Sequence, residues 1–251
     1  MSAIRDMIRR RHQHDAGFTL VEMLVAMMLL GALGTVFMTT VLGAQNSARA
    51  TSSAQDLNEE ARLALNRMAR ELRQSTAITA VNNPDGSSYS SSAITSVTFS
   101  ADFDGDGCIN GVAPTPTPSP APTCNAASTS NPEILTYCWD PSASVRQLYL
   151  IPGQLSGPTC QVSNALPILA GQVTAFKLSY RSNQYLYDDN GDGITTWTEL
   201  DQAGAPVGNS DGALDQPELS EVDSVVIELT VSSGGKHTQS YMTQVDLRNL
   251  S

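Results

Sequence analysis

Acidic residues and glycines recur along this chain at spacings that suit a calcium ion. The clearest stretch, Asp188–Glu199, matches the pattern D-x-[DN]-x-[DN]-G-x5-E at every required position. In such a loop, short side chains place oxygens around a tight turn, a glycine permits the bend, and a final glutamate adds two oxygens. This oxygen-rich shell is the coordination that Ca²⁺ prefers. The predicted ligands are Asp188, Asn190, Asp192, the backbone carbonyl of Ile194, and Glu199, with Gly193 at the bend.

Two other acidic stretches match the same pattern in part. In a loop at 207–218, Val207 stands at the first position, where a carboxylate is needed. In a loop that starts at Asp102, Ala113 stands where the closing glutamate is needed. Acidic surface turns are the alternative interpretation of all three stretches, because Asp and Gly favour turns in any case. The further candidate ligands are Asn209, Asp211, Asp215 and Glu218 at 207–218, and Asp102, Asp104 and Asp106 at 102–110.

The stretch that contains the first two loops, 188–218, has few apolar side chains. We expect that packing alone does not order such a segment. Bound Ca²⁺ would neutralise its carboxylates together and would bind only the folded arrangement. A ligand that binds only the native state stabilises it, so calcium is expected to raise the stability of this part of the chain.

A different chemistry, processing at a membrane, is indicated near the N-terminus. The residues from Met23 to Ala48 include no charged side chain, a run of 26 positions. That run exceeds the roughly 20 residues that a helix needs to cross a bilayer. It is also longer than the core of an ordinary secretory signal, and no small-x-small cleavage site follows it. Glu22 lies at the start of this apolar helix, where a carboxylate is costly in lipid and indicates a functional role with a partner.

The sequence Gly17-Phe18-Thr19-Leu20-Val21-Glu22 before the apolar run resembles the class III signal of type IV prepilins and type II secretion pseudopilins. The resemblance implies that prepilin peptidase cuts after Gly17, that Phe18 becomes an N-methylated terminus, and that Glu22 guides assembly. The free amine of Phe18 is a plausible partner for Glu22 of a neighbouring subunit, since a buried charge must be paired. A plain transmembrane anchor is the alternative, but it explains neither Gly17 nor Glu22.

Charge and composition limit the remaining possibilities. The whole chain has a net charge of −11. Removal of the leader 1–17, which holds four arginines and two aspartates, leaves 10 basic and 23 acidic residues, a net charge of −13. Basic residues before the apolar run favour a cytoplasmic N-terminus and a head outside the cytoplasm. The acidic body argues against direct nucleic-acid binding. We expect no enzyme, since His237 is the one histidine after the leader and no phosphate loop or C-x-x-C occurs.

The apolar run is expected to continue as one helix from Phe18 to about Ser75. The segment 18–46 would form the membrane or filament core, and 47–77 the amphipathic continuation that packs on a head formed by 78–251. The segment Leu63–Arg73 resembles the larger minor pilins and pseudopilins. Turn residues at Asn82–Gly86 would end this part of the chain. The apolar stripe consists of Ala54, Leu57, Ala61, Leu65, Met68 and Leu72, at steps of three and four residues.

The rest of the chain is predicted to be β-structure. The clearest pair is Val225–Val231 and Tyr241–Leu247, which alternate apolar and polar residues around a glycine-bearing turn at Ser232–Lys236. A long helix packed on one antiparallel sheet gives an α+β, pilin-like fold. The other predicted strands are Ile94–Ser100, Ile134–Trp139, Val145–Ile151 and Val173–Tyr180.

All four cysteines, Cys108, Cys124, Cys138 and Cys160, lie after the apolar run, which is consistent with an oxidising compartment and two disulfides. A proline-rich stretch, Pro114–Pro122, separates the first two and is expected to be an extended, solvated loop. Four cysteines allow three pairings, and the sequence does not select one. Our preferred pairing joins neighbours in the sequence, 108 with 124 and 138 with 160.

These features favour a minor pilin or pseudopilin, a structural subunit that initiates, caps or joins a filament. Its expected partners are prepilin peptidase, other pilins or pseudopilins and the inner membrane. The sequence does not choose between a type IV pilus, a type II secretion pseudopilus and a competence system. The alternative function is a pilus-tip adhesin or a DNA-uptake module.

Overall fold

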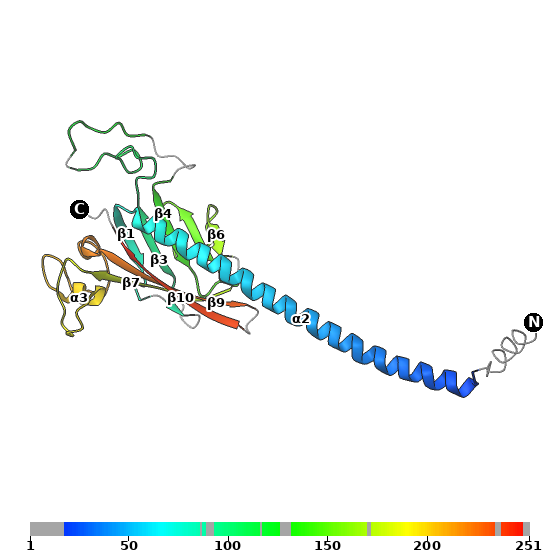
Figure 1. Ribbon diagram of the computed structural model, residues 1–251. Coiled ribbons are helices and arrows are strands. Elements are labelled where there is room, and N and C mark those ends of the chain that lie inside the picture. The colour runs from blue at the N-terminus through cyan, green and yellow to red at the C-terminus, as the bar shows by residue number, and fades with distance from the viewer. Residues whose placement is uncertain are drawn as a thin grey trace, which may run out of the picture. The chain divides into compact units, whose positions relative to one another are not determined.

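The computed structural model describes residues 18–85, 87–88, 93–115, 117–125, 132–169, 172–233 and 237–247 (Figure 1). The chain divides into two compact units, which meet in the sequence between Ser52 and Ser53. The predicted leader 1–17 lies outside the described residues. Helix α2 spans Leu20–Arg73, close to the predicted bounds of Phe18 and Ser75. The Thr19 hydroxyl accepts a hydrogen bond from the backbone N–H of Glu22 at 3.2 Å, as a helix-capping residue does.

The two parts of α2 have different surroundings. No side chain from Phe18 to Asp56 is buried within the described part of the chain, although most of them are apolar. This is the one described helix that is long and apolar enough to cross a membrane. From Leu57 onwards, one face of the helix is buried. That face consists of Leu57, Ala61, Ala64, Leu65, Met68, Glu71 and Leu72, which agrees with the apolar stripe predicted from the sequence.

The chain after α2 forms two antiparallel sheets, where the sequence analysis predicted one. The first sheet has the strand order β1-β3-β4-β5-β6. The second has the order β10-β9-β7-β2, with β8 paired to β7. The first sheet consists of β1 (Ala77–Asn82), β3 (Thr95–Ser100), β4 (Ile134–Trp139), β5 (Leu148–Pro152) and β6 (Leu166–Leu169). The second consists of β2 (Ser87–Ser88), β7 (Gln172–Ser182), β8 (Thr195–Thr196), β9 (Ser224–Ser233) and β10 (His237–Asp246).

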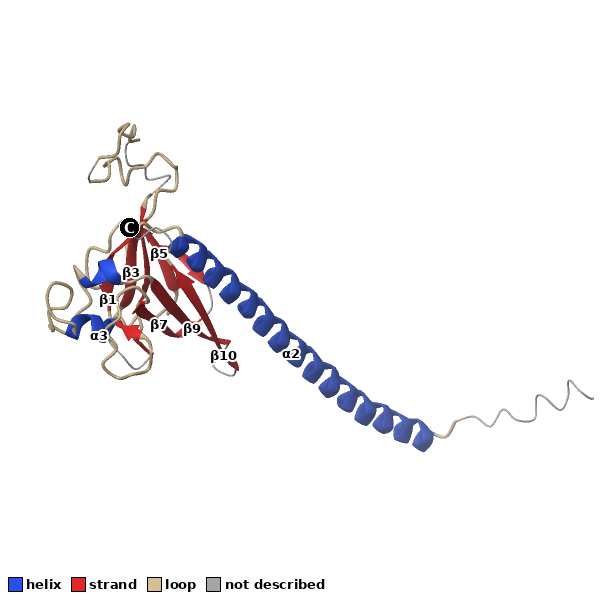
Figure 2. Ribbon diagram, turned by 60° about the vertical axis from the view of Figure 1, so that its left-hand side comes forward, coloured by secondary structure: helices blue, strands red, loops and turns tan. Residues whose placement is uncertain are grey.

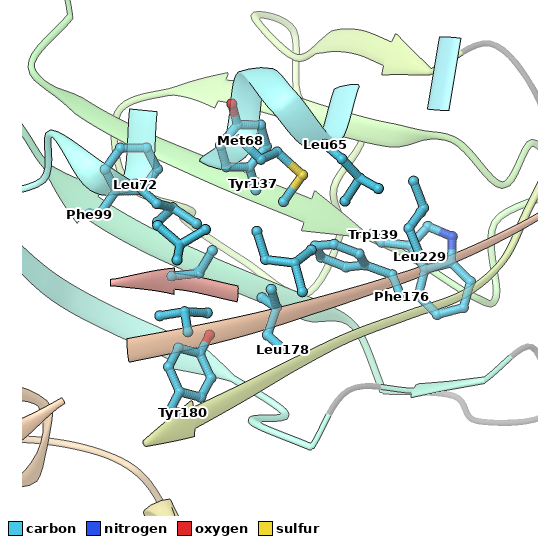
Figure 3. Packing of buried hydrophobic residues seen from close by; sticks show 14 of the residues in the cluster. Leu65, Met68, Leu72, Phe99, Tyr137, Trp139, Phe176, Leu178, Tyr180 and Leu229 are labelled. Carbon is cyan, nitrogen blue, oxygen red and sulfur yellow. The ribbon is translucent and has the colours of Figure 1, made fainter. Parts of the chain in front are cut away.

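The two sheets and the second half of α2 share one core. All six residues of β3 are buried, including the polar ones, so this strand is covered on both faces. One continuous core contains residues of α2 and of both sheets. Figure 3 shows Leu65 and Met68 of α2 near Tyr137 of the first sheet and above Phe176 and Leu178 of the second. The described second half of α2 and the strands that it covers are seen again in Figure 2.

Two local predictions need correction. The helix ends at Arg73 and β1 begins at Ala77, so the predicted helical segment 47–77 is too long and a strand was missed. The segment 188–218 is attached to the head by buried apolar side chains, because Leu200, Val207 and Leu214 lie in the main core. This segment also contains a short helix, α3 (Trp197–Gln202), and the 3-10 helix η2 begins at its end (Glu218–Glu221). Packing therefore orders part of a region in which the sequence predicted little contribution from packing.

The predicted hairpin is present in the second sheet. Strands β9 and β10 pair in antiparallel register, with Ser224 opposite Asp246 at one end and Ser233 opposite His237 at the other. Strand β10 lies at the edge of the sheet. Part of its predicted turn, 234–236, lies outside the described residues.

Candidate functional site

The loop 188–199 folds around the side chain of its first residue. The two carboxylate oxygens of Asp188 accept hydrogen bonds from the backbone N–H groups of Gly191 at 2.7 Å and Gly193 at 2.8 Å. The side chains of Asn190 and Asp192 each accept a bond from the N–H two residues further on, at 2.8 Å in both cases. Gly193 has a φ of +80°, a conformation that favours glycine. The loop thus gathers the side-chain oxygens that the sequence pattern predicted.

Glu199 closes this loop from the first turn of α3. Its carboxylate accepts hydrogen bonds from the N–H of Thr196 at 2.8 Å and the N–H of Asp189 at 3.2 Å. These bonds, with that from Thr196 first, lower the pKa of Glu199 although the residue is buried. The carboxylate is therefore charged and fixed in position. Ile194, the predicted carbonyl ligand, lies between the glycine and Thr195, the first residue of β8.

The loop at 207–218 has the same internal hydrogen bonds but a different first residue. Asn209 and Asp211 accept bonds from the N–H two residues further on, at 2.9 and 2.8 Å. The role that Asp188 has in the first loop is taken by Asp201, whose carboxylate accepts bonds from the N–H groups of Asp211 and Gly212 at 3.0 and 3.1 Å. Val207, which was expected to leave this position without a ligand, is instead part of the core.

Glu218 closes this second loop and is fully buried, with an exposed fraction of 0%. It accepts bonds from the N–H groups of Asp215 at 3.1 Å and Asn209 at 3.3 Å. Burial raises the pKa of Glu218, which is the opposite of the shift at Glu199. A positive ion at this site would favour the charged carboxylate. The loop therefore brings together all four predicted residues and one that the sequence did not indicate, Asp201.

The third loop, at 102–110, repeats the geometry of the first. Asp102 accepts bonds from the N–H groups of Gly105 at 2.7 Å and Gly107 at 2.9 Å. The side chains of Asp104 and Asp106 accept bonds from the N–H two residues further on, at 3.1 and 2.8 Å. The missing glutamate is supplied from elsewhere in the chain, because potential ligand atoms of Asp102, Asp104, Asp106 and Glu133 all lie within 4.8 Å of one another. A cluster of this kind could hold a metal ion.

Sequence reasoning missed Asp201 and Glu133 for different reasons. Asp201 lies eight residues before Asn209, so the fixed spacing of the pattern cannot find it. Its position two residues after Glu199 in α3 was the available signal, since a turn of helix can serve two loops. Glu133 lies 27 residues after Asp106 and no local spacing connects them.

The cysteines form two disulfides, Cys108–Cys124 and Cys138–Cys160. Both agree with the preferred pairing. The first closes the loop that contains the proline-rich stretch, whose described residues are mostly exposed. The second joins the centre of the first sheet to the stretch between β5 and β6 and has a small apolar cluster around it.

The residues predicted for processing and assembly lie at the start of the helix. Gly17 is outside the described residues. Phe18 is 78% exposed, and Glu22 lies in the first turn of α2 with its side chain exposed. Both therefore lie on an apolar surface that nothing in the described chain covers.

Comparison with known proteins identifies this N-terminal segment. The prokaryotic N-terminal methylation motif matches residues 12–38, which include Gly17, Phe18 and Glu22. Comparison with curated proteins gave no match. Among solved structures, the chain is similar to the type IV-like pilin TTHA1219 from Thermus thermophilus, with 14% identity, a TM-score of 0.37, and coverage of 77% of this chain and 97% of that chain.

The motif and the architecture agree with each other. The chain carries a class III prepilin signal, and its long apolar helix precedes antiparallel sheets, as in the pilin-like fold that the sequence predicted. Such a motif implies processing by prepilin peptidase and assembly with other pilins as a pilin or pseudopilin subunit. The apolar helix supports anchoring in a membrane before assembly.

Proposed function

We propose that this protein is a minor subunit of a type IV pilus or a type II secretion pseudopilus. In this proposal, prepilin peptidase cuts after Gly17 in the cytoplasm, and the head lies outside the cytoplasm. The mature subunit then initiates, caps or joins the filament through the N-terminal half of α2. The observation that carries the proposal is the exposed apolar surface of Phe18–Ala44, which overlaps the methylation motif.

This exposed apolar surface is unfavourable in water. Apolar side chains in water cost roughly 25 cal/mol for each Å² that remains exposed. A membrane covers them before assembly, and the helices of neighbouring subunits would cover them in a filament. Glu22 is the one charged residue on the helix before Arg49, so burial among neighbours requires a counter-charge for it. The amine of Phe18 on an adjacent subunit has the required charge.

We further propose that the loops at 188–199 and 207–218 bind calcium in the head. Each gathers three or more carboxylates or amides around a turn and closes it with a buried glutamate. Oxygen ligands of this number and hardness suit Ca²⁺. Helix α3 connects the two sites, because it carries Glu199 of one loop and Asp201 of the other. Calcium would therefore fix this end of the head during export and assembly.

Filament composition tests the main proposal. Filaments sheared from the native host would be analysed by quantitative mass spectrometry for the peptide that begins at Phe18. We expect the mature protein at a small fraction of the major subunit, and loss or shortening of filaments when its gene is deleted. A protein that is found only in the membrane, with normal filaments in the deletion strain, would contradict the proposal.

One observation favours a second candidate, a tip adhesin. The proline-rich loop between Cys108 and Cys124 is exposed where the structure describes it, and such a loop can reach a surface. A net charge of −13 after processing disfavours DNA as the ligand. Attachment of cells that carry a loop deletion, compared with their filament number, would separate adhesion from assembly.

A further inference from the structure

The carboxylate of Glu133 is an unusual feature of the first sheet. Glu133 directly precedes β4 and is only 5% exposed. Its Oε2 accepts a hydrogen bond from the backbone N–H of Asn110. Its Oε1 is buried and has no hydrogen-bond partner among the described residues. A buried carboxylate oxygen that is left unpaired costs free energy, so it calls for a proton, an ion or another partner.

The surroundings of Glu133 are strongly negative. The carboxylates of Asp102, Asp104 and Asp106 offer ligand atoms within 4.8 Å of its own and of one another. Four carboxylates this close repel one another unless a cation lies between them. Backbone N–H groups donate to some of the aspartate oxygens, but no hydrogen bond from a described residue reaches Oε1 of Glu133.

We propose that Asp102, Asp104, Asp106 and the distant Glu133 form a calcium site. Glu133 takes the place of the closing glutamate that the local sequence lacks at Ala113. The site does not depend on the assignment of the chain to a filament, because it follows from the head alone.

The other two loops of this chain support the assignment. In each of the three loops, the N–H at the ninth position donates to the closing glutamate: Thr196 to Glu199, Asp215 to Glu218, and Asn110 to Glu133. Glu133 therefore has the same relation to its loop as the two local glutamates have to theirs. The difference is that the disulfide-closed stretch 108–124 separates Glu133 from the aspartates of its loop in the sequence.

The position of the site gives it a structural role. Asn125, next to Cys124, donates from its backbone N–H to Asp106 at 2.6 Å and from its side chain to Asp104 at 3.2 Å. Cys108 follows Asp106 directly. A cation here would hold both ends of the proline-rich loop against the start of β4. Figure 1 shows this loop projecting from the first sheet, well separated from α3 and the other two candidate sites.

Calcium titration of the full chain in detergent tests the proposal. The variant Glu133→Gln keeps the shape of the side chain and its bond from Asn110, but removes the charge. Calorimetry with Ca²⁺ alone, after removal of metal with EGTA, should show one bound ion fewer than in the unchanged chain. The exposed residue Glu59 on α2 provides a matched control, since Glu59→Gln removes the same charge far from the loop and should not change the number of ions.

A variant in which the other two loops are disabled isolates this site. The double variant Glu199→Gln, Glu218→Gln should disable the other two loops and retain one calcium ion. Addition of Glu133→Gln to it should weaken that remaining binding by roughly 10-fold or more, as loss of a charged ligand does. A folded double variant that binds no calcium at millimolar concentration, or binding that Glu133→Gln leaves unchanged, would overturn the proposal. If the double variant does not fold, an unchanged number of ions in Glu133→Gln alone decides against it.

Discussion

Replacement of Tyr137 by phenylalanine should destabilise the head by about 1.5–3 kcal/mol. Tyr137 is fully buried in β4, and its hydroxyl donates a hydrogen bond to Oε2 of Glu71 on α2. Glu71 is itself only 8% exposed, so its carboxylate relies on hydrogen-bond partners within the protein. Hydrogen bonds to charged groups contribute about 1.5–3 kcal/mol each, and the loss is largest when the partner stays buried. Burial, and then Glu71, raise the pKa of Tyr137, so the hydroxyl remains a donor.

Arg67 provides the internal comparison. Its Nε lies 2.8 Å from Oε1 of the same glutamate, one helical turn away. The Arg67 side chain is 43% exposed, so water screens the pair, and such a pair contributes at most about 1 kcal/mol. Arg67→Met should therefore cost less than Tyr137→Phe, although both remove a partner of Glu71. The order of the two effects follows from exposure and not from the number of bonds.

The assay is thermal and urea unfolding of the full chain in detergent, with both disulfides intact. For a unit of this size, each kcal/mol lowers the Tm by roughly 2–4 °C. Glu71→Gln and the double variant Tyr137→Phe, Glu71→Gln complete a mutant cycle that isolates the coupling between the two side chains. The reasoning is refuted if Tyr137→Phe lies within about 0.5 kcal/mol of the unchanged protein, or if Arg67→Met is the more damaging of the two.

Further outcomes are expected for processing, assembly, calcium and packing. Gly17→Glu should leave an unprocessed precursor in the membrane, and a mature N-terminus other than Phe18 in mass spectrometry would disprove the cleavage site. Glu22→Leu should be processed and inserted normally but should join filaments poorly; recovery in filaments at the normal level would exclude a role for its charge. The full chain should melt higher in calcium than in EGTA, by the equivalent of roughly 2.7 kcal/mol at a hundredfold excess over Kd, and Asp192→Ala should remove part of this difference. Met68→Ala should cost about 2–5 kcal/mol in urea unfolding, because Met68 is completely buried, whereas a cost below 1 kcal/mol would mean that the helix does not pack as described.

Calcium is expected to stabilise less of the head than the sequence alone indicated. Leu200, Val207 and Leu214 attach the acidic segment to the core, so part of its order is independent of any ion. The apolar residues are sparse in the sequence, but each is placed where the fold can bury it. Calcium is therefore expected to stabilise the loops rather than to create them, and the EGTA-treated protein should retain its sheets.

Local patterns in the sequence determined the features that depend on near neighbours. The prepilin signal, the apolar helix and its buried stripe follow from residue types at fixed short spacings, and the structure gives α2 nearly the predicted bounds. The hairpin of β9 and β10 follows from alternation around a turn. The loop at 188–199 is equally local, since all of its predicted ligands lie within twelve residues.

The tertiary structure decided what depends on distant parts of the chain. The change from one sheet to two arises because β7 pairs with β9, which lies some forty residues further on, and not with the adjacent β6. Asp201 and Glu133 join acidic loops only after the chain has folded, because each lies outside the twelve-residue spacing of its loop. Spacing in the sequence carries no information about such approaches, because the free energy that brings these residues together comes from the burial of the core and not from the loops themselves.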